Sequence, residues 1–65
     1  MPLFEIVRYQ NEQELPRRWR FHAAEVEEAR DEFARALHML VPEADSAELY
    51  NDDGDLIDQG CAVAG

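Results

Sequence analysis

Residues 23–41 read AAEVEEARDEFARALHMLV, and this pattern predicts one amphipathic helix. At 100° per residue, its large apolar side chains and several alanines fall within one stripe roughly 100° wide. The stripe consists of Val26, Ala29, Phe33, Ala36, Leu37 and Leu40. Carboxylates occupy the first turns and Arg35 and His38 lie toward the end, which is the charge order that the helix dipole favours. Pro42 should end the helix, because it lacks an amide hydrogen and disfavours helix in the residue before it.

Two strands are predicted before this helix. Residues 3–9, LFEIVRY, are rich in β-branched and aromatic side chains and carry apolar residues on both faces, as a central strand does. Residues 17–22, RRWRFH, alternate with a period of two, so that Trp19 and Phe21 point to the same side. We expect these two segments to pair antiparallel across a polar loop at residues 10–16.

A second hairpin is predicted after the helix, from residues 46–51 and 55–59. A type I turn followed by Gly54 in the left-handed conformation would close it with a loop of three residues. A two-residue turn would instead set Leu49 against Asp58, whereas the three-residue loop pairs apolar or aromatic side chains with one another on each face. The pairs that it predicts are Leu49 with Ile57 and Tyr50 with Leu56.

The order β-β-α-β-β predicts an α+β fold, in which a four-stranded, mainly antiparallel sheet carries one helix on one face. Because the third strand should run parallel to the second, the first strand must lie between them, which gives the strand order 2-1-3-4. Residues 1–65 would form a single small domain, with residues 60–65 as a fraying tail. The predicted core is Phe4, Ile6, Trp19, Phe21, Val26, Ala29, Phe33, Leu37, Leu40, Leu49 and Ile57.

The charge of the chain is strongly acidic. Fifteen Asp and Glu residues stand against six arginines, for a net charge of −9. Such a field repels nucleic acid and anionic membranes and favours basic partners, so we expect neither direct nucleic-acid binding nor membrane association. No long apolar run or signal sequence is present, and the single Cys61 cannot form an internal disulfide. These features predict a cytoplasmic protein.

No motif for catalysis, nucleotides or metals is found in the sequence. Residues 51–55, NDDGD, suggest a calcium loop, but the first and last ligand positions of an EF-hand would be Leu49 and Gly60. The other metal-ligand or nucleophile candidates, none with a motif spacing, are His22, His38 and Cys61. The sequence therefore predicts a non-enzymatic domain without a cofactor or a metal site.

The face of the sheet that one helix cannot cover is the first candidate surface. It would combine apolar side chains with Tyr and Arg, which is the composition of many protein interfaces. Its residues are Leu3, Val7, Tyr9, Arg18, Arg20, Tyr50 and Leu56. This surface predicts a protein-interaction domain, which would also allow a homodimer through the same face. The simpler interpretation is a monomer with scattered hydrophobic residues on its surface.

The exposed face of the helix is the second candidate surface. It carries the carboxylates of Glu25, Glu27, Glu28, Asp31 and Glu32. The alternative function is therefore an inhibitor of the phage or mobile-element type, which imitates the phosphates of nucleic acid and occupies a basic groove. The simpler interpretation is an ordinary solvated helix face.

Overall fold

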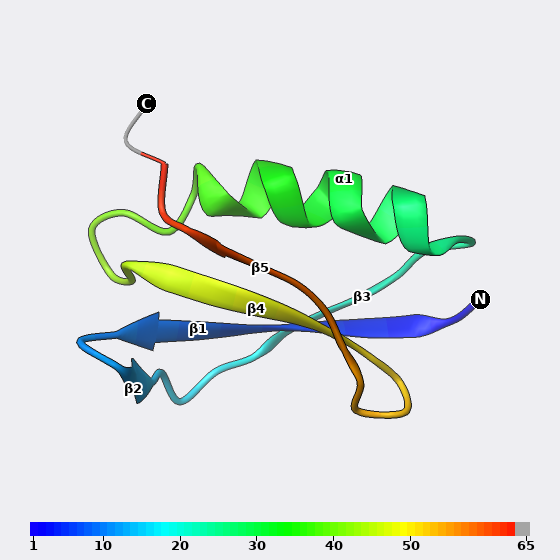
Figure 1. The fold of residues 1–65 in the computed structure, drawn as a ribbon, viewed down its shortest axis with the longest axis horizontal. Coiled ribbons are helices and arrows are strands. Elements are labelled where there is room, and N and C mark those ends of the chain that lie inside the picture. Colours follow the sequence, from blue (N-terminus) through cyan, green and yellow to red (C-terminus); the bar gives the residue numbers. More distant parts are fainter. Residues whose placement is uncertain (64–65) are drawn as a thin grey trace.

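The computed structural model describes residues 1–63, which form a mainly antiparallel sheet with a single helix lying across one of its faces (Figure 1). The elements in chain order are β1 (Leu3–Gln10), β2 (Gln13–Glu14), β3 (Trp19–His22), α1 (Val26–Leu37), β4 (Ser46–Asn51) and β5 (Leu56–Cys61). The α+β class with one helix is therefore confirmed. Among the described residues, no helix has the length and apolar character needed to cross a membrane.

The number of strands is corrected, and the added strand changes the full strand order, although the four predicted strands have the neighbours that were expected. The sheet has five strands, because residues 13 and 14 of the expected loop pair with the end of β1. Strands β2 and β3 lie in succession along the same edge of β1, while β4 pairs with its other edge and β5 follows. A two-residue turn makes this possible, since Asn11 and Glu12 both adopt positive φ, at 52° and 67°. The long strand β1 thus pairs with both short strands, β2 and β3, along one edge.

The helix is shorter than predicted at both ends. It begins after Glu25, which is extended and provides no side-chain cap. Ala23 is still part of the extended chain, fully buried, and its N–H donates to the carbonyl of Pro2. At the other end the N–H groups of His38 and Met39 bond three residues back, which tightens and closes the last turn. Residues 39–41 therefore leave the helix before Pro42.

The hairpin of β4 and β5 combines the two registers weighed from the sequence. Tyr50 pairs with Leu56 as predicted, but a bulge follows, and Leu49 pairs with Asp58 rather than with Ile57. Gly54 has the predicted left-handed backbone, with φ of 86°. Two backbone N–H groups of the loop, from Asp53 and Asp55, donate to the side-chain oxygen of Asn51 and hold the turn.

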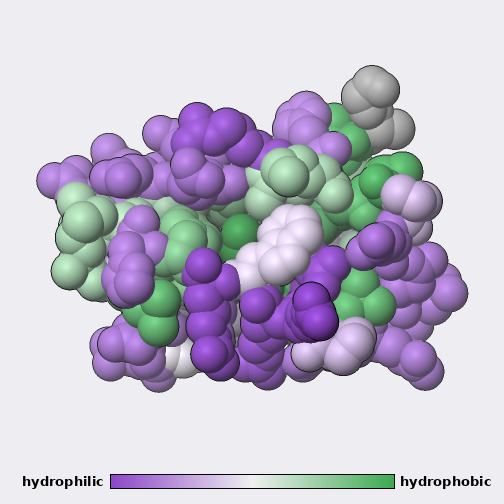
Figure 2. All heavy atoms as spheres, turned by 180° about the vertical axis from the view of Figure 1, so that it is seen from behind, coloured by the Kyte–Doolittle hydropathy of each residue, from purple (hydrophilic) through white to green (hydrophobic). Residues whose placement is uncertain are grey.

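The core lies between α1 and the sheet. Six of the predicted core residues are fully buried: Phe4, Ile6, Ala29, Phe33, Leu40 and Leu49. Four more are half-buried against them: Trp19, Phe21, Leu37 and Ile57. Val26 was wrongly assigned, since it is 43% exposed as the first residue of the shortened helix. Seen from behind, a band of apolar surface separates the hydrophilic helix from the mostly hydrophilic lower half (Figure 2).

Small residues allow the helix to approach the sheet. Ala36, Ala44 and Ala47 are buried, although only Ala36 belongs to the predicted stripe. At Gly60 of β5, a Cβ atom would lie 2.7 Å from the Cδ1 atom of Leu37, so only glycine fits beneath this leucine without a shift. The two chain segments are therefore packed closely at the end of α1.

The C-terminal segment was expected to fray from residue 60 onward. Instead, Gly60 and Cys61 belong to β5, and the N–H groups of Ala62 and Val63 donate to the carbonyls of Asp45 and Leu37. The part of that expectation that concerns Ala64 and Gly65 lies outside the described residues.

Candidate functional site: the outer face of the sheet

The face of the sheet turned away from α1 carries all seven residues that the sequence proposed for partner binding. Alternation along β1 places Leu3, Val7 and Tyr9 there, on the side opposite the buried Phe4 and Ile6. The strand register sets Arg20, Tyr50 and Leu56 beside them, and the ion pair with Glu5 brings Arg18 to the same face. We call this surface the outer face.

Two tyrosines on the outer face share one carboxylate. The hydroxyls of Tyr9 and Tyr50 both donate to Oε1 of Glu48, at 2.7 and 2.8 Å. The hydrogen bond to this anion favours the neutral phenol, so it raises the pKa of Tyr9 to about 12 and also raises the pKa of Tyr50. Both aromatic rings are thereby fixed in position.

Two arginines on the outer face share a second carboxylate. The Nε atom of Arg20 lies 2.7 Å from Oε1 of Glu5, and a terminal nitrogen of Arg18 lies 3.4 Å from Oε2 of the same side chain. Arg18 also pairs with Glu14 of β2 at 3.1 Å. The hydrogen bond from Arg20 is the main reason that the pKa of Glu5 is lowered.

The apolar part of the outer face is smaller than the sequence suggested. Val7 at its centre is only 2% exposed, although no helix covers it. Leu3 is half-buried, and Leu56 is the large apolar side chain that remains exposed, at 49%. The accessible groups of this face are therefore mainly aromatic and charged.

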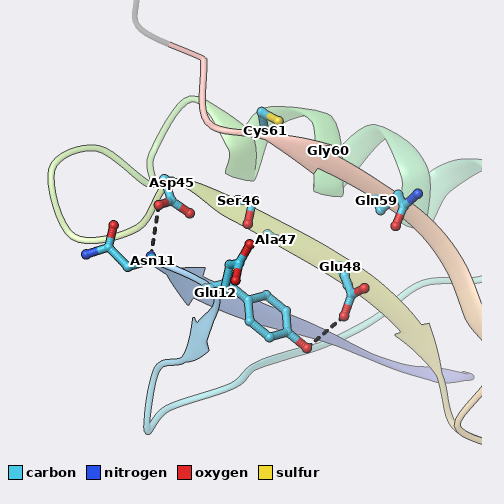
Figure 3. Close-up of a pocket in the computed structure, with 10 residues that line it drawn as sticks. Asn11, Glu12, Asp45, Ser46, Ala47, Glu48, Gln59, Gly60 and Cys61 are labelled. Atoms are coloured by element: carbon cyan, nitrogen blue, oxygen red, sulfur yellow. Dashed lines mark hydrogen bonds between the residues drawn. The ribbon is translucent and has the colours of Figure 1, made fainter.

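An open depression lies on the outer face where β1 ends, between the β1–β2 turn and strands β4 and β5. Asp45 directly precedes β4, Ser46 and Glu48 lie on β4, and Gln59, Gly60 and Cys61 lie on β5 (Figure 3). The depression is acidic, with carboxylates from Glu12, Asp45 and Glu48, and the described residues that line it include no arginine or histidine. The sequence does not predict its position next to the paired tyrosines, because residues 10–16 are expected to form a polar loop and not the turn that contributes Glu12.

The acidic face of the helix has the predicted position. All five carboxylates, Glu25, Glu27, Glu28, Asp31 and Glu32, are exposed. Glu32 forms an ion pair with Arg35 one turn later, and Glu28 accepts a weak hydrogen bond of 3.4 Å from the N–H of Ala24. The remaining three have no cation within 4 Å among the described residues.

Arg8 is the buried polar residue that sequence reasoning missed. It lies on the helix side of β1, 7% exposed, with its guanidinium 4.6 Å from the ring centroid of Trp19. One terminal nitrogen donates to the carbonyl of Arg17 at 2.9 Å, and the other lies 3.6 Å from the carboxylate of Glu43. The sequence pattern does indicate this position, because the alternation along β1 that buries Phe4 and Ile6 also points residue 8 toward the helix.

The residues considered for metal binding are distributed over separate elements. His22 ends β3, His38 caps α1 and Cys61 is exposed at the end of β5. Within residues 1–63, no three His, Cys, Asp or Glu side chains gather in a way that could hold an ion.

No protein-family model, curated protein or solved structure matches the chain.

Proposed function

We propose that this chain is a non-enzymatic, acidic protein-interaction domain that binds its partner through the outer face. The observation that supports this is the fixed arrangement of two tyrosines and two arginines around Glu48 and Glu5 on a face that the helix leaves uncovered. Tyr and Arg are enriched at the centres of interfaces. Side chains that are already held lose less conformational entropy on binding, which favours association.

A partner of a different kind fits this face better than a second copy does. Two chains of net charge −9 repel each other, and Arg18 and Arg20 already have a carboxylate partner within the chain. A typical stable interface also buries about 800 Å² on each side with an apolar centre, whereas Val7 is covered in the isolated chain. A homodimer would have to exchange these internal pairs for equivalent ones across the twofold axis.

The acidic helix face supports a second candidate, imitation of nucleic-acid phosphates. Glu25, Glu27 and Asp31 are exposed and have no cation within 4 Å among residues 1–63, so they are free to meet a basic groove. Binding of this kind would weaken steeply with salt, because it depends mainly on charge.

Affinity capture from the native host with three baits separates the two candidates. The first bait is the unchanged chain, the second carries Arg20→Ser with Tyr50→Ser on the outer face, and the third carries Glu27→Gln with Asp31→Asn on α1. Circular dichroism checks that each variant is folded. We expect a partner that is retained by the first and third baits and lost by the second.

The opposite pattern, with loss on the helix variant alone, would support the phosphate-imitation candidate and contradict the proposal. A set of captured proteins that is the same for all three baits would contradict both. Sedimentation equilibrium of the unchanged chain at low and high salt tests self-association. A dimer that tightens as salt screens the repulsion would identify the second copy as the occupant of the outer face.

A further inference from the structure

The outer face divides into two halves of different charge balance. On the β3 side, Arg18 and Arg20 neutralise Glu5 and Glu14. On the β5 side, the described residues that line the depression supply Glu12, Asp45 and Glu48 but no cation. The second half is therefore the place where the excess negative charge of this face gathers.

Five of the six arginines of the chain have partners elsewhere, and the side chain of Arg17 forms no ion pair among the described residues. Arg8 lies near Glu43 on the inner face, and Arg35 pairs with Glu32 on the helix. Arg30 donates to the carbonyl of Ile57. Within residues 1–63, no ion pair to Glu12, Asp45 or Glu48 is formed. Among the contacts of the described residues, this half of the outer face therefore has no counterion.

Glu48 is the carboxylate best prepared to receive one. Both tyrosine hydroxyls bond to its Oε1 atom, and among the described residues its Oε2 atom accepts no hydrogen bond. The side chain is half-buried, so its orientation is fixed while one oxygen still offers lone pairs to a donor. The dashed line to Glu48 in Figure 3 is the hydrogen bond from the hydroxyl of Tyr9, at the edge of the depression.

We propose that this half of the outer face receives an arginine side chain from an extended, basic segment of the partner protein, with Glu48 as its anchor. The inference rests on the proposed function and specifies the chemistry of the partner. A guanidinium fits because its planar fork of donors matches a carboxylate, and because it stacks favourably on aromatic rings such as those of Tyr9 and Tyr50. The chain itself contains such a contact, between Arg8 and Trp19 at 4.6 Å.

The probe for this inference is a short capped peptide with two arginines separated by one serine, titrated into the isotope-labelled protein and followed by amide NMR shifts. The same peptide with citrulline in place of arginine keeps the shape and removes the charge. We expect saturable shifts at the residues of β4 and β5 that line the depression, and binding that is about tenfold weaker for the citrulline peptide.

Two variants of equal charge make the test specific to the site. Glu48→Gln retains an oxygen that can accept the tyrosine hydroxyls, and Glu27→Gln removes the same charge from the helix. We expect Glu48→Gln to weaken binding of the arginine peptide by about fivefold to tenfold and Glu27→Gln by less than about twofold. Equal weakening by the two variants would reduce the binding to general charge attraction and overturn the inference, as would equal binding of the citrulline peptide.

Failure of the inference and failure of the proposed function give different results. If the outer-face bait loses its partner while the arginine peptide causes no saturable shift, the outer face binds by other chemistry and only the inference is overturned. If the captured partner depends on the helix carboxylates, the proposed function itself is wrong. A partner that binds the unchanged chain and discriminates Glu48→Gln from Glu27→Gln as the peptide does would support both.

Discussion

The two faces of the sheet differ in composition, but each contains one buried residue of the opposite character. The inner face is apolar and buries the cation of Arg8, at 7% exposed, while the outer face is charged and aromatic and buries Val7, at 2% exposed. These two residues are neighbours in β1. The comparison shows that in a domain this small burial depends on what lies around a position, and the class of the side chain alone does not decide it.

The means of burial differ between the faces. Arg8 is accepted on the inner face because a carbonyl, a carboxylate and the ring of Trp19 lie around its guanidinium, although its Nε atom has no partner within the described chain. Val7 is covered on the outer face among neighbours such as Tyr9 and Glu48, whose polar ends are bonded to each other. Long polar side chains can shield apolar surface with their carbon stems and rings.

The largest expected effect comes from the inner face, where Phe33 is 1% exposed in the centre of the helix stripe. Phe33→Ala should lower the free energy of unfolding by about 3–5 kcal/mol, because it removes transfer energy and leaves a cavity. Urea denaturation followed by circular dichroism measures the change. A loss below about 1 kcal/mol would mean that the helix does not pack through this residue.

On the outer face, Val7→Glu should lower the free energy of unfolding by nearly as much as Phe33→Ala does. It places a charge at a covered position, and we expect a loss of about 3 kcal/mol in the free energy of unfolding. The matched control is Leu56→Glu on the same face, where the side chain is 49% exposed and the change should stay within about 0.5 kcal/mol. Equal effects in urea denaturation would show that Val7 is accessible and that the face is more open than described.

Arg8→Met should have an intermediate effect, since it replaces the buried cation with an apolar side chain of similar length. The loss of the hydrogen bond to Arg17 and of the contact with Trp19 is partly offset by the smaller desolvation of a neutral group, so we expect about 1–2 kcal/mol. Arg35→Met on the exposed helix is the control, with less than about 0.5 kcal/mol. A stabilised Arg8→Met protein would contradict the role given to these contacts.

The smallest expected effect is a change in how the outer face titrates. The chain has only two tyrosines, and both donate to Glu48. Because the pKa of Tyr9 is raised to about 12 from 10.0, the resulting stabilisation is complete below pH 10 and is lost as the pH rises through about 12. Phenolate absorbance should therefore appear above pH 10, and Glu48→Gln should return both transitions toward 10. Unchanged transitions in this variant would exclude Glu48 as the cause.

Much of the fold could be predicted because the sequence patterns are regular. The period of two along residues 3–9 and 17–22 predicted the pairing of β1 with β3 and the residues of both faces. The helix stripe predicted the buried positions of Ala29, Phe33 and Ala36. The seven residues proposed for the outer face also lie together, since alternation and register determine which side each one occupies.

The remaining features depend on interactions that a sequence pattern does not contain. The short strand β2 has no apolar alternation and exists because Asn11 and Glu12 adopt a turn with positive φ. The bulge that shifts Leu49 onto Asp58 reconciles two registers that each satisfied part of the pattern. The depression and the shared carboxylate of Glu48 required the mutual position of β1, β4 and β5, which no single segment encodes.

The central position of β1 between β3 and β4 has a consequence for the order in which this domain folds. The ladder that joins the two halves of the sheet pairs Phe4 with Asn51 and Tyr9 with Ser46, so most of the chain lies between its partners. Closing so long a loop costs entropy before any contact of that ladder forms, which slows folding relative to a chain with local contacts. During synthesis β1 is made before β4, which pairs with it. We therefore expect β1 and β3 to pair first, with the other edge of β1 unpaired until β4 has been made.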